Sequence, residues 1–199
     1  AIMNGAVYNV AVGHSALSEN TTGIANIGVG AYAGANNTTG THNVAIGAND
    51  GTTWMGALQT NTVGAYNIAI GAAALSLANE NDNDGTVAIG HLACKVQAGT
   101  GGAQFANATV GIGYKALTAL TTGPSNTAVG YRSMLTAGNA QNNVMVGFDT
   151  GYQMRPGGAF NTVLGSKAFS GAHTTSDTDW CTAIGYNALV GALNNADRN

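Results

Sequence analysis

The stretch Asn43-Val44-Ala45-Ile46-Gly47 decides the fold, because the same phrase returns along the whole chain. Each copy has a β-branched residue, a small residue and an aliphatic residue, followed by glycine. The repeat glycines are Gly13, Gly30, Gly47, Gly71, Gly90, Gly113, Gly130, Gly147, Gly165 and Gly185, with spacings of 17, 17, 24, 19, 23, 17, 17, 18 and 20 residues. A base period with insertions indicates a repeat protein, in which each unit packs only against its neighbours.

The residues before each repeat glycine predict a short β-strand rather than a helix. Apolar residues alternate with a period of two, and glycine recurs too often for a helix. Alternate strand residues point to opposite faces, and we expect the β-branched face to line an internal core. A single chain would leave the opposite face in water, so we infer association, in which partner subunits cover that face. That face consists of the small residues, among them Ala11, Ala45, Ala69, Ala88, Ala128 and Ala183.

Asparagine stands four residues before most repeat glycines, at Asn9, Asn26, Asn43, Asn67, Asn126, Asn143 and Asn161. Asparagine tolerates tight turns, and stacked copies can form a ladder of amide hydrogen bonds. We interpret these residues as corners of stacked coils rather than as ligands. Turns such as Thr38-Thr39-Gly40 close the coils. Residues 1–199 are therefore predicted to form one all-β domain, a parallel solenoid of about ten coils.

Composition excludes two classes of partner. Only 8% of the residues are charged and the net charge is −3, so no basic field attracts a nucleic acid. No apolar run in the sequence is long enough for a transmembrane helix, and we expect no membrane insertion. Cys94 and Cys181 are 87 residues apart and hold different positions relative to the repeat glycines. This placement predicts two buried free thiols rather than a disulfide.

Three copies carry a resemblance to a known family: Asn-Val-Ala-Ile-Gly at 43–47, Asn-Thr-Ala-Val-Gly-Tyr at 126–131, and Thr-Ala-Ile-Gly-Tyr-Asn-Ala-Leu at 182–189. They are similar to the YadA-like head repeat of trimeric autotransporter adhesins. The version with 17 residues and Thr-Thr-Gly turns is more similar still to repeats in bacteriophage tail fibres. The resemblance implies a left-handed parallel β-roll, a homotrimer around a common axis, and a role in surface attachment. The insertions depart from regular heads, which keep a constant coil length.

The resemblance implies a structural and adhesive segment of a longer phage tail fibre, located in the virion. Such a segment binds a host cell-surface glycan or protein through its loops. The alternative with the same fold is the head of a bacterial trimeric adhesin on the outer surface of the cell. Neither function requires a cofactor.

Four connections that depart clearly from the base period are the predicted binding loops: residues 51–66, 76–85, 94–108 and 170–181. Loops on a rigid scaffold often carry recognition, and aromatic faces suit sugars and interface contacts. The candidate receptor-binding residues are Trp54, Met55, Phe105, His173 and Trp180. The alternative is that each tryptophan only packs its loop against the solenoid.

Two sets of residues are candidates for a metal ion. Asp82 and Asp84 open a stretch similar to a calcium loop, but His91 stands where the bidentate glutamate should follow Gly85. His14 and His91 both follow a repeat glycine, and in a trimer each could meet two copies of itself. We expect instead a solvated acidic loop and histidines that face outward or pack.

The sequence contains no nucleophile elbow and no zinc-protease motif, and we do not expect an enzyme. A glycan-cleaving spike is an alternative of another class. It requires a pair of carboxylates, for which Asp177 and Asp179 are the candidates.

Overall fold

Each copy of the repeat contributes one three-residue strand to a single sheet. The computed structural model describes residues 5–51, 55–78, 83–96, 107–154, 157–171 and 178–191, and these ranges contain no helix. The strands are β1 (Val10–Val12), β2 (Ile27–Val29), β3 (Val44–Ile46), β4 (Ile68–Ile70), β5 (Val87–Ile89), β6 (Val110–Ile112), β7 (Thr127–Val129), β8 (Val144–Val146), β9 (Thr162–Leu164) and β10 (Thr182–Ile184).

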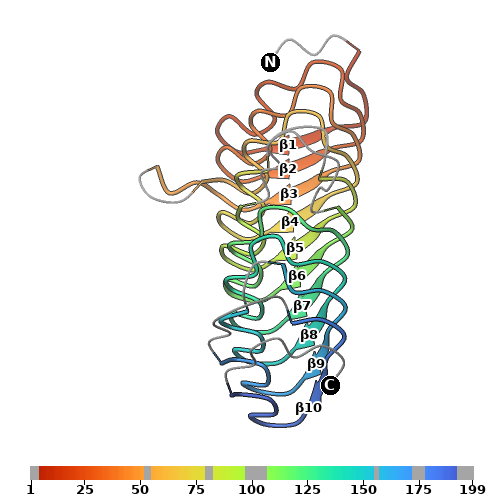
Figure 1. Ribbon diagram of the computed structural model, residues 1–199. Helices are drawn as coiled ribbons and strands as arrows, with labels where there is room; N and C mark the ends of the chain where they lie inside the picture. The colour runs from red at the N-terminus through yellow and green to blue at the C-terminus, as the bar shows by residue number, and fades with distance from the viewer. Residues whose placement is uncertain are drawn as a thin grey trace.

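The strands stack in chain order from β1 to β10, and each neighbouring pair is parallel. The register is the same at every step, so that Ala45 pairs with Ala69 and Ala69 pairs with Ala88. Figure 1 shows the result, an elongated stack of coils with β1 near one end and β10 near the other. The predicted all-β parallel solenoid, with one copy of the phrase per coil, is confirmed.

The repeat glycines form a column in which successive coils touch through their backbones. Their φ angles lie between 122° and 155°, a region that L side chains rarely adopt. A Cβ atom on Gly13 would lie 2.7 Å from the carbonyl carbon of Gly30, and one on Gly71 would lie 2.7 Å from that of Gly90. Glycine is therefore required here both by the backbone conformation and by the close approach of the next coil.

The two faces of the strands are arranged in the opposite way to the prediction. The middle residues Ala45, Ala69, Ala88, Ala128 and Ala183 are at most 2% exposed within a single chain. Ala11 is exposed because it lies in the first strand of the stack. The β-branched residues face outward instead. The prediction that partner subunits cover the alanine face is therefore wrong, and the alanines belong to the core.

The wall opposite the sheet explains this reversal. Its side chains fill the interior and leave room only for small residues on the strands. A Cβ atom added to Gly28 in β2, for example, would lie 2.9 Å from Leu17 Cγ. Where β8 carries the larger Met145, the facing residue is Gly151, and a Cβ atom there would collide with the Met145 sulfur. The buried side chains of this wall are Leu17, Leu58, Leu75, Cys94, Leu117, Met134 and Phe169.

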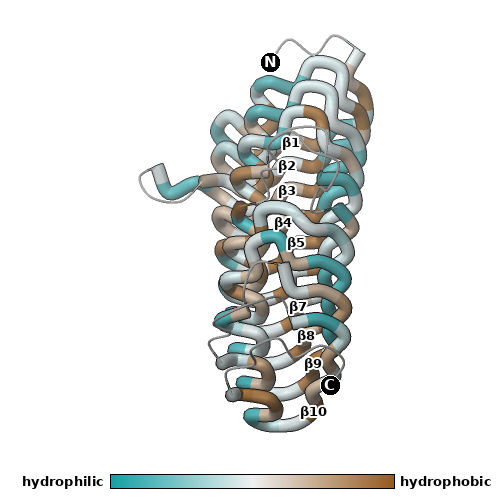
Figure 2. Tube along the Cα trace, in the orientation of Figure 1, coloured by the Kyte–Doolittle hydropathy of each residue, from teal (hydrophilic) through white to brown (hydrophobic). Residues whose placement is uncertain are grey.

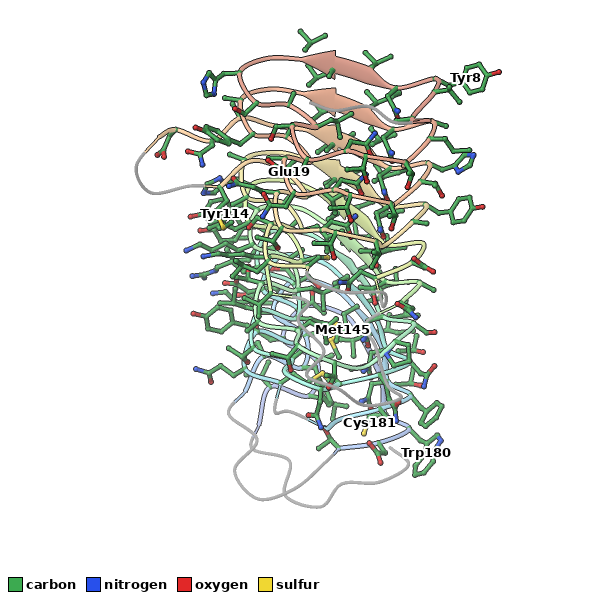
Figure 3. All side chains as sticks on the ribbon, turned by 90° about the horizontal axis from the view of Figure 1, so that it is seen from above. Tyr8, Glu19, Tyr114, Met145, Trp180 and Cys181 are labelled. Carbon is green, nitrogen blue, oxygen red and sulfur yellow. The ribbon has the colours of Figure 1, made fainter. Side chains whose placement is uncertain are left out.

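Cys94 and Cys181 are buried free thiols, as predicted. Cys94 occupies one place in the opposite wall, in front of Gly111 of β6. Burial raises the pKa of the Cys94 thiol to about 12. Figure 3 shows Cys181 inside the stack close to its C-terminal end. Both cysteines therefore act as small core residues rather than as reactive groups.

The predicted asparagine ladder is present along the strands. Each side-chain oxygen accepts a hydrogen bond from the backbone N–H of the equivalent residue in the next coil. The Asn26 N–H donates to Asn9 Oδ1 at 2.8 Å, and the Asn43 N–H donates to Asn26 Oδ1 at 2.9 Å. The series resumes at Asn126 and reaches the backbone N–H of Cys181 through Asn161. The interpretation of these residues as corner residues is confirmed.

A second asparagine ladder, which the sequence analysis missed, lies in the turns of the first coils. It consists of Asn20, Asn37 and Asn61, and we call it the corner ladder. Asn37 Nδ2 donates to Asn20 Oδ1 at 2.9 Å, and Asn61 Nδ2 donates to Asn37 Oδ1 at 3.0 Å. Each amide also donates to the carbonyl of the glycine three residues later. The repeated Asn-x-x-Gly spacing in the sequence is the pattern from which this ladder could have been predicted.

Candidate functional site: the outer face and its aromatic edges

The outward residues of the strands form one continuous strip, which we call the outer face. It comprises the residues three and one before each repeat glycine, and all are aliphatic except Thr127, Thr162 and Thr182. The exposed fraction is 57% at Val12, 37% at Ile46 and 49% at Leu164. Figure 2 shows hydrophobic residues recurring along the strand column from coil to coil. An uncharged aliphatic strip of this length is characteristic of an interaction surface.

Aromatic rings line one edge of the outer face. The residues directly after the repeat glycines form what we call the post-glycine column. Four successive coils carry His91, Tyr114, Tyr131 and Phe148 in this column, and we call these four the aromatic ladder. Their ring centroids are 5.7, 5.1 and 5.2 Å apart, with interplanar angles of 20°, 15° and 8°. The sequence alone does not reveal the ladder, because its four rings are 17 to 23 residues apart in the chain and become neighbours only when the coils stack.

Stacking within the ladder hides the ring faces and leaves the ring edges at the surface. Tyr114 and Tyr131 each have another ring on both sides, which restricts the access of a ligand to their faces. Cations lie beside two of the rings: Lys115 Nζ is 5.3 Å from the Tyr114 centroid, and Arg132 Cζ is 4.9 Å from the Tyr131 centroid. Each cation directly follows its ring in the chain. An open ring face exists only where the ladder ends or is interrupted.

Arg132 cross-links two coils through an ion pair. Its Nε and Nη2 atoms donate to Asp149 Oδ1 and Oδ2 at 2.8 and 2.7 Å. The hydrogen bond to this carboxylate raises the pKa of the Arg132 guanidinium. The Tyr152 ring centroid also lies 4.6 Å from Arg132 Cζ. The guanidinium is thus held by residues of its own chain.

The opposite edge of the outer face carries further aromatic residues. They stand five residues before a repeat glycine, and we call this set of positions the pre-strand column. His42 stacks on Tyr66 with centroids 5.0 Å apart, and Phe160 stacks on Trp180 at 5.6 Å. Figure 3 shows Tyr8 and Trp180 on one side of the stack and Tyr114 on the other. The aliphatic strip is therefore bordered by rings on both sides.

The predicted receptor-binding residues do not come together in one place. Trp54, Phe105 and His173 lie outside the described residues. Met55 is half-buried, and its carbonyl accepts a hydrogen bond from the Ala73 N–H at 2.8 Å. Trp180 is 50% exposed and lies at a regular corner in the pre-strand column rather than in an extra loop. Its partner Phe160 was not among the predicted residues.

The candidate metal ligands are also dispersed. His14 is exposed beside Tyr32, with ring centroids 5.2 Å apart, and His91 is the first ring of the aromatic ladder. Asp84 Oδ1 accepts a hydrogen bond from the Ala65 N–H at 2.7 Å, and Asp82 lies outside the described residues. Within the described ranges, no three His, Cys, Asp or Glu residues gather into a possible metal site.

Asp179, the described member of the carboxylate pair considered for glycan cleavage, has a backbone partner. Its Oδ1 atom accepts a hydrogen bond from the Ala159 N–H at 2.7 Å, as Asp84 does in an earlier coil. Asp177 lies outside the described residues. The geometry of Asp179 is that of a residue that fixes a corner between two coils.

Charge is distributed unevenly along the chain. All six Lys and Arg residues lie at or after Lys95, whereas five of the nine acidic residues precede it: Glu19, Asp50, Glu80, Asp82 and Asp84. Because the coils stack in chain order, the described cations Lys95, Lys115, Arg132 and Lys167 lie in the later coils, and the described acidic residues Glu19, Asp50 and Asp84 lie in the early coils. An anionic ligand is therefore attracted to the later coils.

A search for related proteins found no matching family model, no matching curated protein and no matching solved structure. The likeness to adhesin heads and tail fibres therefore depends on the repeat itself. Over the ranges that the structure describes, there is no helix of the length and hydrophobicity needed to span a membrane.

Proposed function

We propose that the chain is a structural and adhesive segment of a homotrimeric fibre, in which copies bury their outer faces against one another. The observation that supports this proposal is the uncovered aliphatic strip along β1 to β10. Complete burial of a fully exposed Val or Ile side chain is worth about 1.5–3 kcal/mol, and the outer-face side chains, which are already partly buried, each contribute a part of this. Because the strip has two such positions on most strands, the gain accumulates along the whole stack.

A second copy of the chain fits the outer face better than an unrelated partner. The strip repeats at the spacing of parallel strands, about 4.8 Å. A partner makes contact along the whole strip only if its own side chains repeat at the same spacing. Identical stacks that lie parallel around a common axis meet this condition at every coil. The number of three copies comes from the resemblance to trimeric adhesin heads and tail fibres.

The proposed fibre recognises a cell-surface glycan or protein through residues outside the buried strip. The exposed rings of the aromatic edges support this role, because tyrosine and tryptophan combine an apolar ring with a polar group. The late coils add cations to these rings. We favour a segment of a phage tail fibre, and the head of a bacterial trimeric adhesin is the alternative with the same repeat.

Analytical ultracentrifugation of the purified chain tests the assembly. We expect a mass three times that of one chain for the unmodified protein. Ile68→Asp places a charge on the outer face and should produce folded monomers, as judged by circular dichroism. Thr22→Asp, at an exposed turn outside the strip, is the matched control and should remain trimeric. A monomeric unmodified protein, or a trimeric Ile68→Asp variant, would contradict the proposed interface.

Binding of the labelled chain to surfaces tests the recognition role. Adsorption to bacterial cells that is lost after removal of their surface polysaccharide supports a tail fibre. Adsorption to animal extracellular matrix supports an adhesin head. A trimer that adsorbs to neither surface would contradict the adhesive part of the proposal and leave the structural part standing.

A further inference from the structure

The post-glycine column contains one interruption between aromatic residues in the cationic half of the molecule. Phe148, Ser166 and Tyr186 occupy this column in three successive coils. The backbone confirms the register, because the Lys167 N–H donates to the Phe148 carbonyl at 2.7 Å and the Asn187 N–H donates to the Ser166 carbonyl at 3.1 Å. Ser166 therefore stands where the preceding coils carry a ring. Phe148 stacks on Tyr131 on one side only, and Tyr186 is 72% exposed.

We propose that this interruption is a binding slot for an acidic pyranose sugar, such as a uronic acid residue of a surface polysaccharide. The ligand ring takes the place of the missing aromatic ring, between Phe148 and Tyr186. Its carboxylate is bound by Lys167, and its hydroxyl groups can bond to the Ser166 hydroxyl. The slot is formed by one chain, but its use in surface recognition rests on the proposed function.

The interruption has the size of one ring. The centroids of successive ladder rings lie 5.1 and 5.2 Å apart, so a missing ring leaves a space of about 10 Å between the rings on either side. In the ladder itself, one ring fills a space of this size. A pyranose ring has C–H groups on both faces, so a sugar in this space can contact both Phe148 and Tyr186.

The place of Lys167 favours an acidic ligand. In two preceding coils, the cation that follows the ring in the chain lies against that ring, as Lys115 does with Tyr114 and Arg132 with Tyr131. Lys167 holds the same position after Ser166, where no ring is present. A ligand ring in the slot would therefore lie beside Lys167, just as the Tyr114 and Tyr131 rings lie beside Lys115 and Arg132. Asp149, which holds the equivalent position in the coil before Lys167, is paired with Arg132.

A second interruption provides an internal control. Tyr8, Ala25 and His42 occupy three successive coils of the pre-strand column, and Ala25 stands where its neighbours carry rings. No Lys or Arg residue occurs before Lys95. This interruption therefore has the same spacing without a cation, and we expect it to have no preference for an acidic sugar.

The test uses the full chain and two defined probes, methyl β-D-glucuronide and methyl β-D-glucoside, with binding followed by saturation-transfer NMR and titration. We expect the glucuronide to bind more tightly than the glucoside. Ser166→Phe completes the aromatic ladder and should abolish binding while the circular dichroism spectrum is unchanged. Lys167→Gln should weaken glucuronide binding about tenfold and leave glucoside binding unchanged. Ala25→Phe, at the control interruption, should leave glucuronide binding unchanged.

Three results would overturn the slot: no binding of the glucuronide, equal binding of the two probes, or glucuronide binding that survives Ser166→Phe. If Ser166→Phe does not fold, Lys167→Gln still decides the role of the cation. A chain that adsorbs to cells but does not bind the glucuronide would leave the proposed function intact and refute the slot. A chain that binds the glucuronide but adsorbs to no cell would refute the adhesive function and leave the slot intact.

Discussion

The first coils and the later coils of the stack use the same backbone but stabilise their turns differently. In the first coils, the corner ladder of Asn20, Asn37 and Asn61 joins the turns by amide hydrogen bonds. At the equivalent places in later coils stand Leu120, Ala137 and Met154, which are fully or almost fully buried and belong to the hydrophobic core. The turns therefore have the same geometry whether their interior is filled by hydrogen-bonded amides or by apolar side chains. The backbone frame of the solenoid is therefore independent of the chemistry inside its turns.

The early and later coils also carry different side chains at the surface. The post-glycine column carries the small residues Ala31, Ala48 and Ala72 in early coils and the aromatic ladder in later coils. The described Lys and Arg residues also lie in the later coils. The same backbone thus presents mostly small residues in this column in the early coils, and stacked rings with cations beside them in the later coils.

The largest expected effect concerns the glycine column, which both regions share. Gly30→Ala and Gly130→Ala should each destabilise the protein by about 3 kcal/mol or more, because the new Cβ atom meets the backbone of the next coil. Urea unfolding measures the loss. Gly191→Ala, with no atom within 4 Å of the added Cβ, is the control and should have little effect. If only one of the two substitutions, Gly30→Ala in the early coils or Gly130→Ala in the later coils, destabilised the protein, the idea of a shared backbone frame would be refuted.

Breaking the corner ladder should affect the early coils alone. Asn37→Ala removes the donor to Asn20 Oδ1 and the acceptor of Asn61 Nδ2. Because both partners are buried, we expect a loss of about 2–4 kcal/mol. Amide hydrogen exchange should show the loss of protection between β1 and β4, with β7 to β9 unchanged. The exposed neighbour Asn36 provides the control variant Asn36→Ala.

Extending the corner ladder tests the comparison in the opposite direction. Asn61 Oδ1 is buried without a hydrogen-bond partner, and Ala78 occupies the next place. Ala78→Asn should supply the missing donor and raise the free energy of unfolding by about 1 kcal/mol. Ala137→Asn places the same amide among the apolar turn residues and should destabilise the protein. If Ala78→Asn and Ala137→Asn changed the melting temperature in the same direction, the turns of the early and later coils would not differ as described.

A further expected effect is a dependence of stability on pH at Cys94. Burial raises the pKa of this thiol from 9.0 to about 12, so the folded protein favours the protonated form. The stabilisation is complete below pH 9 and is lost as the pH rises toward 12, by about 1.4 kcal/mol per pH unit. Unfolding free energies at pH 8 and pH 10 measure the loss. In Cys94→Ala, this part of the pH dependence should disappear.

The strands, the glycine corners and the asparagine ladder along the strands could be predicted from the sequence, because each is a local pattern aligned on glycine. Which face of each strand points into the core could not be predicted from the sequence. Both faces are apolar, so the alternation of residues does not distinguish them. The deciding fact is the volume of Leu17, Leu75 and their equivalents on the opposite wall. The aromatic ladder required the register between coils, since Tyr114 and Tyr131 are distant in sequence and become neighbours only when the coils stack.

The direction of the hydrogen bonds between strands has a mechanical consequence. They join each coil to the next and therefore lie along the length of the stack. A force that pulls the two ends apart loads these bonds in series, so that the end coil detaches before the interior ones. Because each coil contacts only its neighbours, the stack extends one coil at a time under tension. A load on the two ends would thus meet a gradual release of length rather than an abrupt rupture.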